Sequence, residues 1–124
     1  MRGRLVAIGV GLAMIAGTAD AAMPLPVFLA KAEALQKKGA MALFSGDLKV
    51  LKEEIRTSLL SVRSERLAAK AAGRPQAFCP PAEGGKLGSD ELLAGLRQIP
   101  PAERARMDVR EGLKRFLARK YPCR

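Results

Sequence analysis

The chain has 124 residues, of which 48% are hydrophobic and 27% are charged, and its Lys and Arg exceed its Asp and Glu to give a net charge of +10. This length supports one small domain and excludes a two-domain enzyme. Histidine is absent, so imidazole-assisted Ser or Cys catalysis and ordinary zinc sites are excluded within this chain. We therefore expect a protein that is not an enzyme and needs no cofactor and no metal.

The N-terminus has the pattern of a secretory signal. Arg2 and Arg4 precede an apolar run over residues 5–17, and the small residues Ala19 and Ala21 follow it. We predict a signal peptide over residues 1–21 that is cleaved after Ala21. The alternative is an uncleaved membrane anchor, but the run is shorter than the roughly 20 residues that a spanning helix needs. Residues 22–124 are then a single exported helical domain, periplasmic or secreted, with no transmembrane segment after processing.

The predicted mature chain stays strongly basic. Removal of Arg2, Arg4 and Asp20 leaves a net charge of +9. Such a charge favours anionic glycan, lipid head groups or an acidic partner protein. Only 4% of the residues are aromatic, too few to stack many bases, and we expect no nucleic-acid partner.

The first half of the domain predicts two helices. Phe28, Ala32 and Leu35 have helical spacing within residues 27–38, and Gly39 is a typical C-terminal glycine. Residues 40–44 are apolar and either extend this helix or form a short turn. Ser45 is a candidate cap for a long amphipathic helix from Leu48 to about residue 72. Its single core-facing stripe consists of Leu48, Leu51, Ile55, Leu59 and Val62.

The second half predicts a loop and two further helices. The loop covers residues 75–88, after which Ser89 is expected to cap a helix over residues 90–98. Pro100 and Pro101 end that helix, and a final helix is expected over residues 102–120. Its predicted core face contains Ala105, Val109, Leu113, Phe116 and Leu117, and a basic row beside that face contains Arg106, Arg110 and Lys114.

No stretch alternates as a β-strand does, so the predicted fold is all-α, a small helical bundle of about four helices stapled by one disulfide. The staple is expected between Cys79 and Cys123, the only cysteines, because exported chains with two thiols most often form one bond. A redox pair and an intermolecular bridge are the alternatives. Leu60 and Leu67 lie off the core-facing stripe. Such apolar side chains could pack against a second copy of the chain, so a homodimer is possible.

The order of residues in the C-terminal part resembles a known family. Phe78-Cys79-x-Pro81 is followed by a glycine-containing loop, a helix opened by Ser89, Ile99-Pro100-Pro101, and Tyr121-Pro122-Cys123. Over residues 78–123 the chain is similar to the Rap/Tai immunity proteins of type VI secretion. The resemblance implies a small exported helical protein, often dimeric, with a disulfide between Cys79 and Cys123. It also implies a protein partner, since members of this family bind and block peptidoglycan amidase toxins in the periplasm.

The resulting hypothesis is a periplasmic binding protein that inhibits a cell-wall hydrolase. The alternative is a cationic envelope-stability or chaperone-like protein that contacts anionic envelope components. Two surfaces are candidates for partner binding, the loop after Cys79 and the basic row of the last helix. Their residues are Pro80, Pro81 and Lys86 in the loop, and Arg106, Arg110 and Lys114 in the row.

Overall fold

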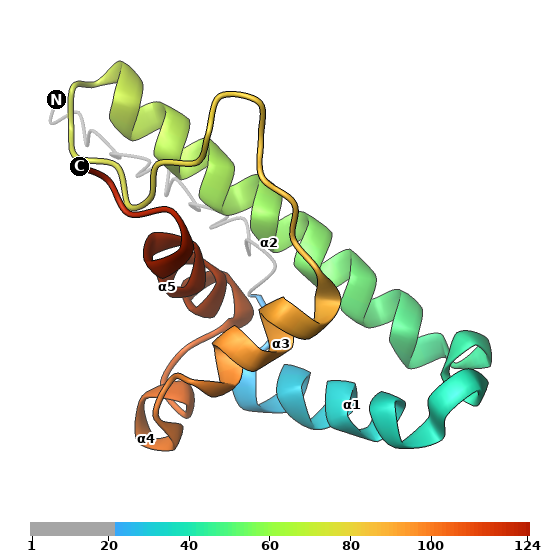
Figure 1. The fold of residues 1–124 in the computed structure, drawn as a ribbon. Helices are drawn as coiled ribbons and strands as arrows, with labels where there is room; N and C mark the ends of the chain where they lie inside the picture. The colour runs from blue at the N-terminus through green and yellow to red at the C-terminus, as the bar shows by residue number, and fades with distance from the viewer. Residues whose placement is uncertain (1–21) are drawn as a thin grey trace, which may run out of the picture.

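A computed structural model describes residues 22–124, and this part of the chain is all-helical (Figure 1). The predicted fold class is confirmed: four helices have seven or more residues, and no strand occurs in residues 22–124 apart from an isolated bridge between Pro24 and Asp108. The elements are α1 (Leu25–Lys38), η1 (Gly39–Phe44), α2 (Gly46–Ala71), α3 (Ser89–Arg97), α4 (Pro101–Arg104) and α5 (Val109–Lys120).

Helices α1 and α2 form an open hairpin whose turn is η1, as Figure 1 shows. The predicted end of α1 at Gly39 is confirmed, and this glycine has a φ of 56°, a conformation that side chains disfavour. Residues 40–44 form a 3₁₀ turn rather than an extension of α1. Ser45 caps α2 as predicted, since its Oγ accepts a hydrogen bond from the Asp47 backbone N–H at 3.3 Å.

The sequence placed the cap of α3 one residue too late. Gly88 occupies the N-cap position, and Ser89 is already the first helical residue, without a side-chain capping bond. Asp90 and Glu91 lie in the first turn as expected, where carboxylates favourably oppose the positive end of the helix dipole.

The prediction of a single helix over residues 102–120 is wrong, because the chain forms the short helix α4, leaves the helical conformation and begins a second helix, α5. Between them, the Met107 carbonyl accepts a hydrogen bond from the Leu25 N–H at 3.0 Å, and the Val109 N–H donates to the Met23 carbonyl at 2.9 Å. These bonds to the N-terminal segment replace helical ones. Asp108 then caps α5 by accepting from the Glu111 N–H at 2.8 Å. Ala105, predicted to lie in the core, is exposed in the turn after α4.

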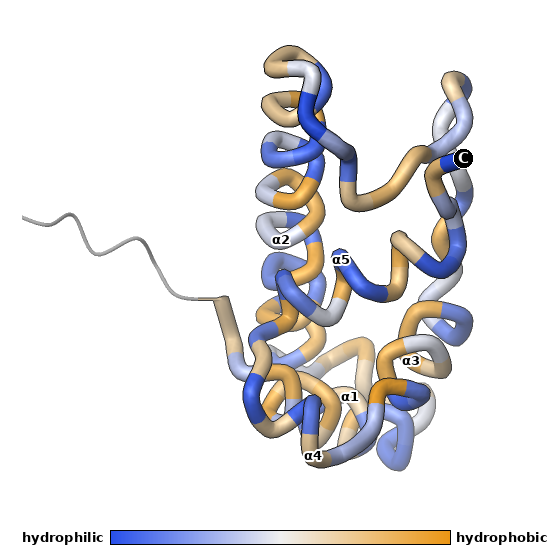
Figure 2. The backbone as a smooth tube through the Cα atoms, turned by 90° about the vertical axis from the view of Figure 1, so that its left-hand side faces the viewer, coloured by the Kyte–Doolittle hydropathy of each residue, from blue (hydrophilic) through white to orange (hydrophobic). Residues whose placement is uncertain are grey.

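The core lies where α1, α2, α3 and α5 meet. Figure 2 shows the hydrophobic side of α2 directed toward the rest of the molecule. Leu25, Leu96, Val109 and Leu113 are fully buried, so the N-terminal segment, α3 and α5 share one hydrophobic centre. The other members of this cluster are Phe28, Leu29, Ala32, Leu35, Leu51, Val62, Phe78, Leu92, Ile99, Met107, Phe116 and Leu117.

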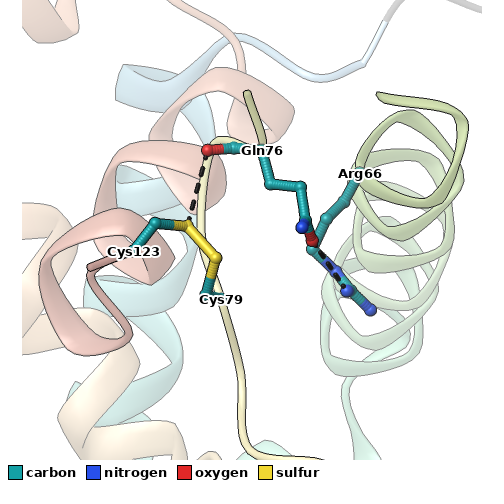
Figure 3. The surroundings of a disulfide bond; sticks show 4 residues. All are labelled: Arg66, Gln76, Cys79 and Cys123. Carbon is teal, nitrogen blue, oxygen red and sulfur yellow. Dashed lines mark hydrogen bonds between the residues drawn. A yellow bond between two sulfur atoms is a disulfide. The ribbon is translucent and has the colours of Figure 1, made fainter. Parts of the chain in front are cut away.

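The predicted disulfide between Cys79 and Cys123 is present and joins the loop after α2 to the C-terminus (Figure 3). Beside it, Cys123 Sγ lies 3.5 Å from the Gln76 carbonyl oxygen, and Arg66 Nη1 of α2 donates to Gln76 Oε1 at 3.4 Å. The Arg66 guanidinium also lies 5.6 Å from the centre of the Phe78 ring. The loop is therefore held both to α2 and to the end of α5.

The predicted signal peptide, residues 1–21, lies outside the described residues. From residue 22 onward, the helices are too short or too polar for any of them to cross a lipid bilayer.

Candidate functional site

An apolar groove of about 460 Å³ lies between α1, α2 and the start of α3. A groove of this size falls within the range of small-ligand and side-chain pockets. Most of its lining is aliphatic or aromatic carbon. The apolar lining residues are Phe28, Ala32 and Leu35 of α1, Ala42 of η1, Leu48, Leu51, Ile55 and Leu59 of α2, Leu87 in the loop before α3, and Leu92 and Leu93 of α3.

The groove lies along the first half of the 26-residue α2, beside α1 and the start of α3. Of the predicted stripe, Leu51 and Val62 are buried, while Leu48, Ile55 and Leu59 are only partly covered. Part of the surface that the sequence assigned to the core therefore remains in contact with water.

Four polar residues border the groove, namely Gln36, Lys52, Ser89 and Asp90. Arg97 Nη2 of α3 donates a hydrogen bond of 2.8 Å to Gln36 Oε1, which joins α3 to α1. Lys52 is exposed and forms no ion pair with any residue from 22 to 124. The groove thus combines a carbon-rich floor with a free cation on its border.

The predicted basic row does not form one free surface. Glu65 of α2 lies 3.7 Å from Arg110 Nη1 and 3.8 Å from Lys114 Nζ, and Lys114 also pairs with Glu111 at 3.1 Å. Arg106 lies in the turn before α5, outside the helical row. Two of the three cations therefore help to join α5 to α2, which lowers the repulsion expected from a like-charged row.

The predicted loop surface lies at the other end of α5. Pro81 and Lys86 are exposed and Pro80 is half-buried, and the Cys79 N–H donates to the Tyr121 carbonyl at 2.8 Å just after α5. Since α5 has 12 residues and spans roughly 18 Å, the loop and Arg106 lie at opposite ends of it. The structure does not bring the two predicted surfaces together, although Leu87, next to Lys86, does line the groove.

The end of α5 is fixed electrostatically. Lys120 Nζ lies 2.7 Å from Glu91 Oε1 of α3 and donates to the Lys86 carbonyl at 2.7 Å. The hydrogen bond that Lys120 donates to Glu91 stabilises the charged ammonium and raises the pKa of Lys120 above its ordinary value of 10.5. On the exposed side of α2, Arg56 donates to Glu53 and lowers the pKa of that carboxyl. Both pairs are structural contacts between neighbouring surface groups.

One feature of the sequence indicates open apolar surface near the groove. Residues 40–44, between the first two predicted helices, carry apolar side chains with no obvious partner. Apolar side chains in the connection between two helices predict carbon surface that stays in contact with water.

Within residues 22–124, no three His, Cys, Asp or Glu side chains gather where they could hold a metal ion. Comparison of this chain with family models, with curated proteins and with solved structures finds no match.

Proposed function

We propose that this chain is an exported binding protein that inhibits a cell-wall hydrolase. The observation that supports binding is the apolar groove between α1, α2 and α3. Water-exposed carbon surface of this kind is typical of sites that a partner covers. The class of partner, a peptidoglycan amidase, comes from the resemblance over residues 78–123.

The shape of the groove fits one segment of a protein. Helices α1, α2 and α3 form its walls, and an amphipathic helix or an apolar loop is the kind of element that lies in such a groove. The free ammonium of Lys52 at the border favours an acidic residue beside the apolar anchor of the partner. Such an anchor, once desolvated, keeps a complex together at moderate salt.

An oxidising compartment is supported by the disulfide, because such bonds persist outside the cytosol and are rare within it. In a bacterial cell that compartment is the periplasm, where peptidoglycan hydrolases act.

The second candidate function is contact with anionic envelope components. It is favoured by the many cations without an ion-pair partner within residues 22–124, among them Lys38, Lys49 and Lys52. Contacts made by exposed charges alone weaken strongly as salt is added, which separates this function from inhibition of one enzyme.

The test is capture followed by inhibition. The exported, oxidised protein is immobilised, a periplasmic extract is applied at low and at moderate salt, and retained proteins are identified by mass spectrometry. We expect one cell-wall hydrolase at both salts, and its release of peptidoglycan fragments should stop at one equivalent of the protein. A diffuse set of components lost at moderate salt would contradict inhibition and favour the second candidate.

A matched pair of variants links inhibition to the groove. Leu93→Gln places an amide in the groove lining, whereas Ala94→Gln makes a similar change at the next, exposed residue of α3 outside it. We expect Leu93→Gln to weaken inhibition at least about tenfold, since an unpaired polar group at an interface costs more than one kcal/mol, and Ala94→Gln to inhibit normally. Equal inhibition by both would exclude the groove as the binding site.

A further inference from the structure

A second apolar surface lies at the turn of the α1–α2 hairpin. We call Met41, Leu43 and Phe44 the apolar tip; their exposed fractions are 66%, 74% and 84%. In residues 22–124 the other exposed large hydrophobic residues are single positions on α1 and α2, at Val27, Val50, Leu60 and Leu67. The apolar tip is therefore a concentrated patch, and Figure 1 shows the turn between α1 and α2 that carries it at the end of the molecule remote from the C-terminus.

The backbone holds this patch away from the core. Gly39 ends α1 with a positive φ, and Ser45 caps α2 immediately after Phe44, so the six residues of η1 are held between two fixed helix ends, and none of them is buried. In a 3₁₀ helix the side chains at positions i and i+3 point the same way, which places Met41 and Phe44 on one side of η1. Only Ala42 of this turn lines the groove.

Lysines surround the apolar tip. Lys37 and Lys38 end α1, and Lys49 and Lys52 lie in the first two turns of α2. The nearby carboxylates are already paired: Glu33 lies 3.3 Å from Lys37 Nζ, Asp47 lies 3.4 Å from Lys31 Nζ, and Glu53, one turn after Lys49, lies 2.7 Å from Arg56 Nη2. Lys38, Lys49 and Lys52 have no ion-pair partner within residues 22–124, so the border of the tip carries an excess of positive charge.

We propose that the apolar tip inserts into the head-group region of an anionic lipid bilayer, with the lysines at its border on the lipid phosphates. Shallow insertion of apolar side chains combined with Lys–phosphate attraction is how peripheral proteins bind such surfaces. A second copy of the chain is disfavoured as occupant, because two tips meeting would bring like charges together. An anionic bilayer supplies both an apolar layer and the opposite charge.

This inference gives the second candidate function a surface and a ligand, and it does not depend on hydrolase inhibition, because none of the apolar tip residues lines the groove. Tip variants should inhibit a hydrolase normally, and Leu93→Gln should bind lipid normally. The inhibition assay and the lipid-binding assay therefore test the two proposals independently.

Because the chain contains no Trp, the fluorescence of a single introduced Trp reports on the surroundings of that position alone. Phe44→Trp and Leu60→Trp each give a protein with one Trp, the first in the apolar tip and the second at an exposed position of α2 outside it. The exported, oxidised proteins are mixed with vesicles of phosphatidylglycerol and phosphatidylcholine, and separately with vesicles of phosphatidylcholine alone. We expect the emission of Phe44→Trp to shift to the blue only with the anionic vesicles, and that of Leu60→Trp to stay unchanged.

Binding is then measured by sedimentation with the anionic vesicles. We expect Leu43→Ser combined with Phe44→Ser to weaken binding about tenfold or more, and Lys38→Gln combined with Lys49→Gln to weaken it by a similar factor. Leu60→Ser is the matched control and should bind normally. Circular dichroism melting shows that each variant is folded, as expected for exposed positions.

Three results would overturn the proposal. The first is the same blue shift at both Trp positions, or at neither. The second is unchanged sedimentation of the Leu43→Ser, Phe44→Ser protein, which would mean adsorption through charge alone. The third is a blue shift of Phe44→Trp that grows with protein concentration without vesicles, together with a dimer in light scattering, which would make the tip a contact between copies of the chain.

Discussion

Gly95 shows how a single missing side chain allows two helices to pack. It is buried in α3, and a Cβ at this position would overlap the ring of Phe116 on α5. Arg119 Nη2 of α5 also donates a hydrogen bond of 3.0 Å to the Gly95 carbonyl. The close approach of α3 and α5 therefore depends on glycine here.

We expect Gly95→Ala to lower the free energy of unfolding by about 1–3 kcal/mol, because the added methyl group displaces a buried aromatic ring. The helix propensity of Ala, which favours it over Gly by about 1 kcal/mol, opposes this loss only in part. Gly46→Ala is the control, since a Cβ there meets nothing within 4 Å. Urea unfolding measures both, and a Gly95→Ala protein as stable as the parent would contradict the packing described.

Lys120 gives a pH dependence with a defined sign. Its pKa is raised by the hydrogen bond to Glu91, so its contribution to stability is complete below the unfolded pKa of about 10.5 and is lost as the pH rises through the higher folded pKa. We expect Lys120→Met to melt at a lower temperature than the parent at neutral pH, and the difference to narrow above pH 10.5. Melting curves over this range provide the test, and a constant difference would contradict it.

At the scale of elements, the disulfide has the largest expected effect. Cys79 and Cys123 are 44 positions apart, and closing a loop of that order in the unfolded chain is worth roughly 4 kcal/mol. We expect Cys79→Ser combined with Cys123→Ser to lower the free energy of unfolding by roughly this amount. The parent in reductant should match the variant, and a parent unaffected by reductant would contradict a structural role for the bond.

The break between α4 and α5 is a feature of the elements that local sequence left undecided. Asp108 followed three residues later by Glu111 is a capping pattern, and it was present in the sequence. The apolar spacing of Val109, Leu113 and Phe116 continues smoothly from Ala105, so periodicity alone favoured one long helix. The hydrogen bonds from Leu25 and to Met23 decide the break, and they come from residues far away in the chain.

At the scale of the whole molecule, the segment before α1 connects α2 to α5. Glu54 Oε1 of α2 accepts a hydrogen bond from the Met23 N–H at 2.7 Å, while the Met23 carbonyl accepts one from Val109 at the start of α5. Leu25, next along the chain, is fully buried. The N-terminal segment is thus part of the tertiary structure from Met23 onward.

We expect Glu54→Ala to lower the free energy of unfolding by about 1–3 kcal/mol, because a partly buried N–H loses its charged acceptor. Glu53→Ala is the matched control on the same turn, where the carboxylate pairs only with Arg56 at the surface, and it should change stability little. Urea unfolding compares the two. Equal losses would mean that the contact with Met23 contributes nothing specific.

The sequence by itself determined what depends on near neighbours. The all-helical class, the end of α1 at Gly39, the Ser45 cap and the stripe on α2 follow from local spacing and capping chemistry, and the two cysteines leave one intramolecular pairing. The predicted binding residues are less determined: the sequence gives the charges of Arg110 and Lys114 but not their pairing with Glu65, which lies on another helix.

Only the tertiary structure decided which apolar side chains are covered. Ile55 and Leu51 have the same place in the α2 pattern and both line the groove, yet Leu51 is buried and Ile55 is only half-buried, because cover depends on how α1 and α3 lie against α2. Likewise, residues 40–44 are apolar in the sequence, and their exposure follows from two helix ends that point them outward. Periodicity specifies the face of a helix, whereas the length and position of its neighbours specify how much of that face meets water.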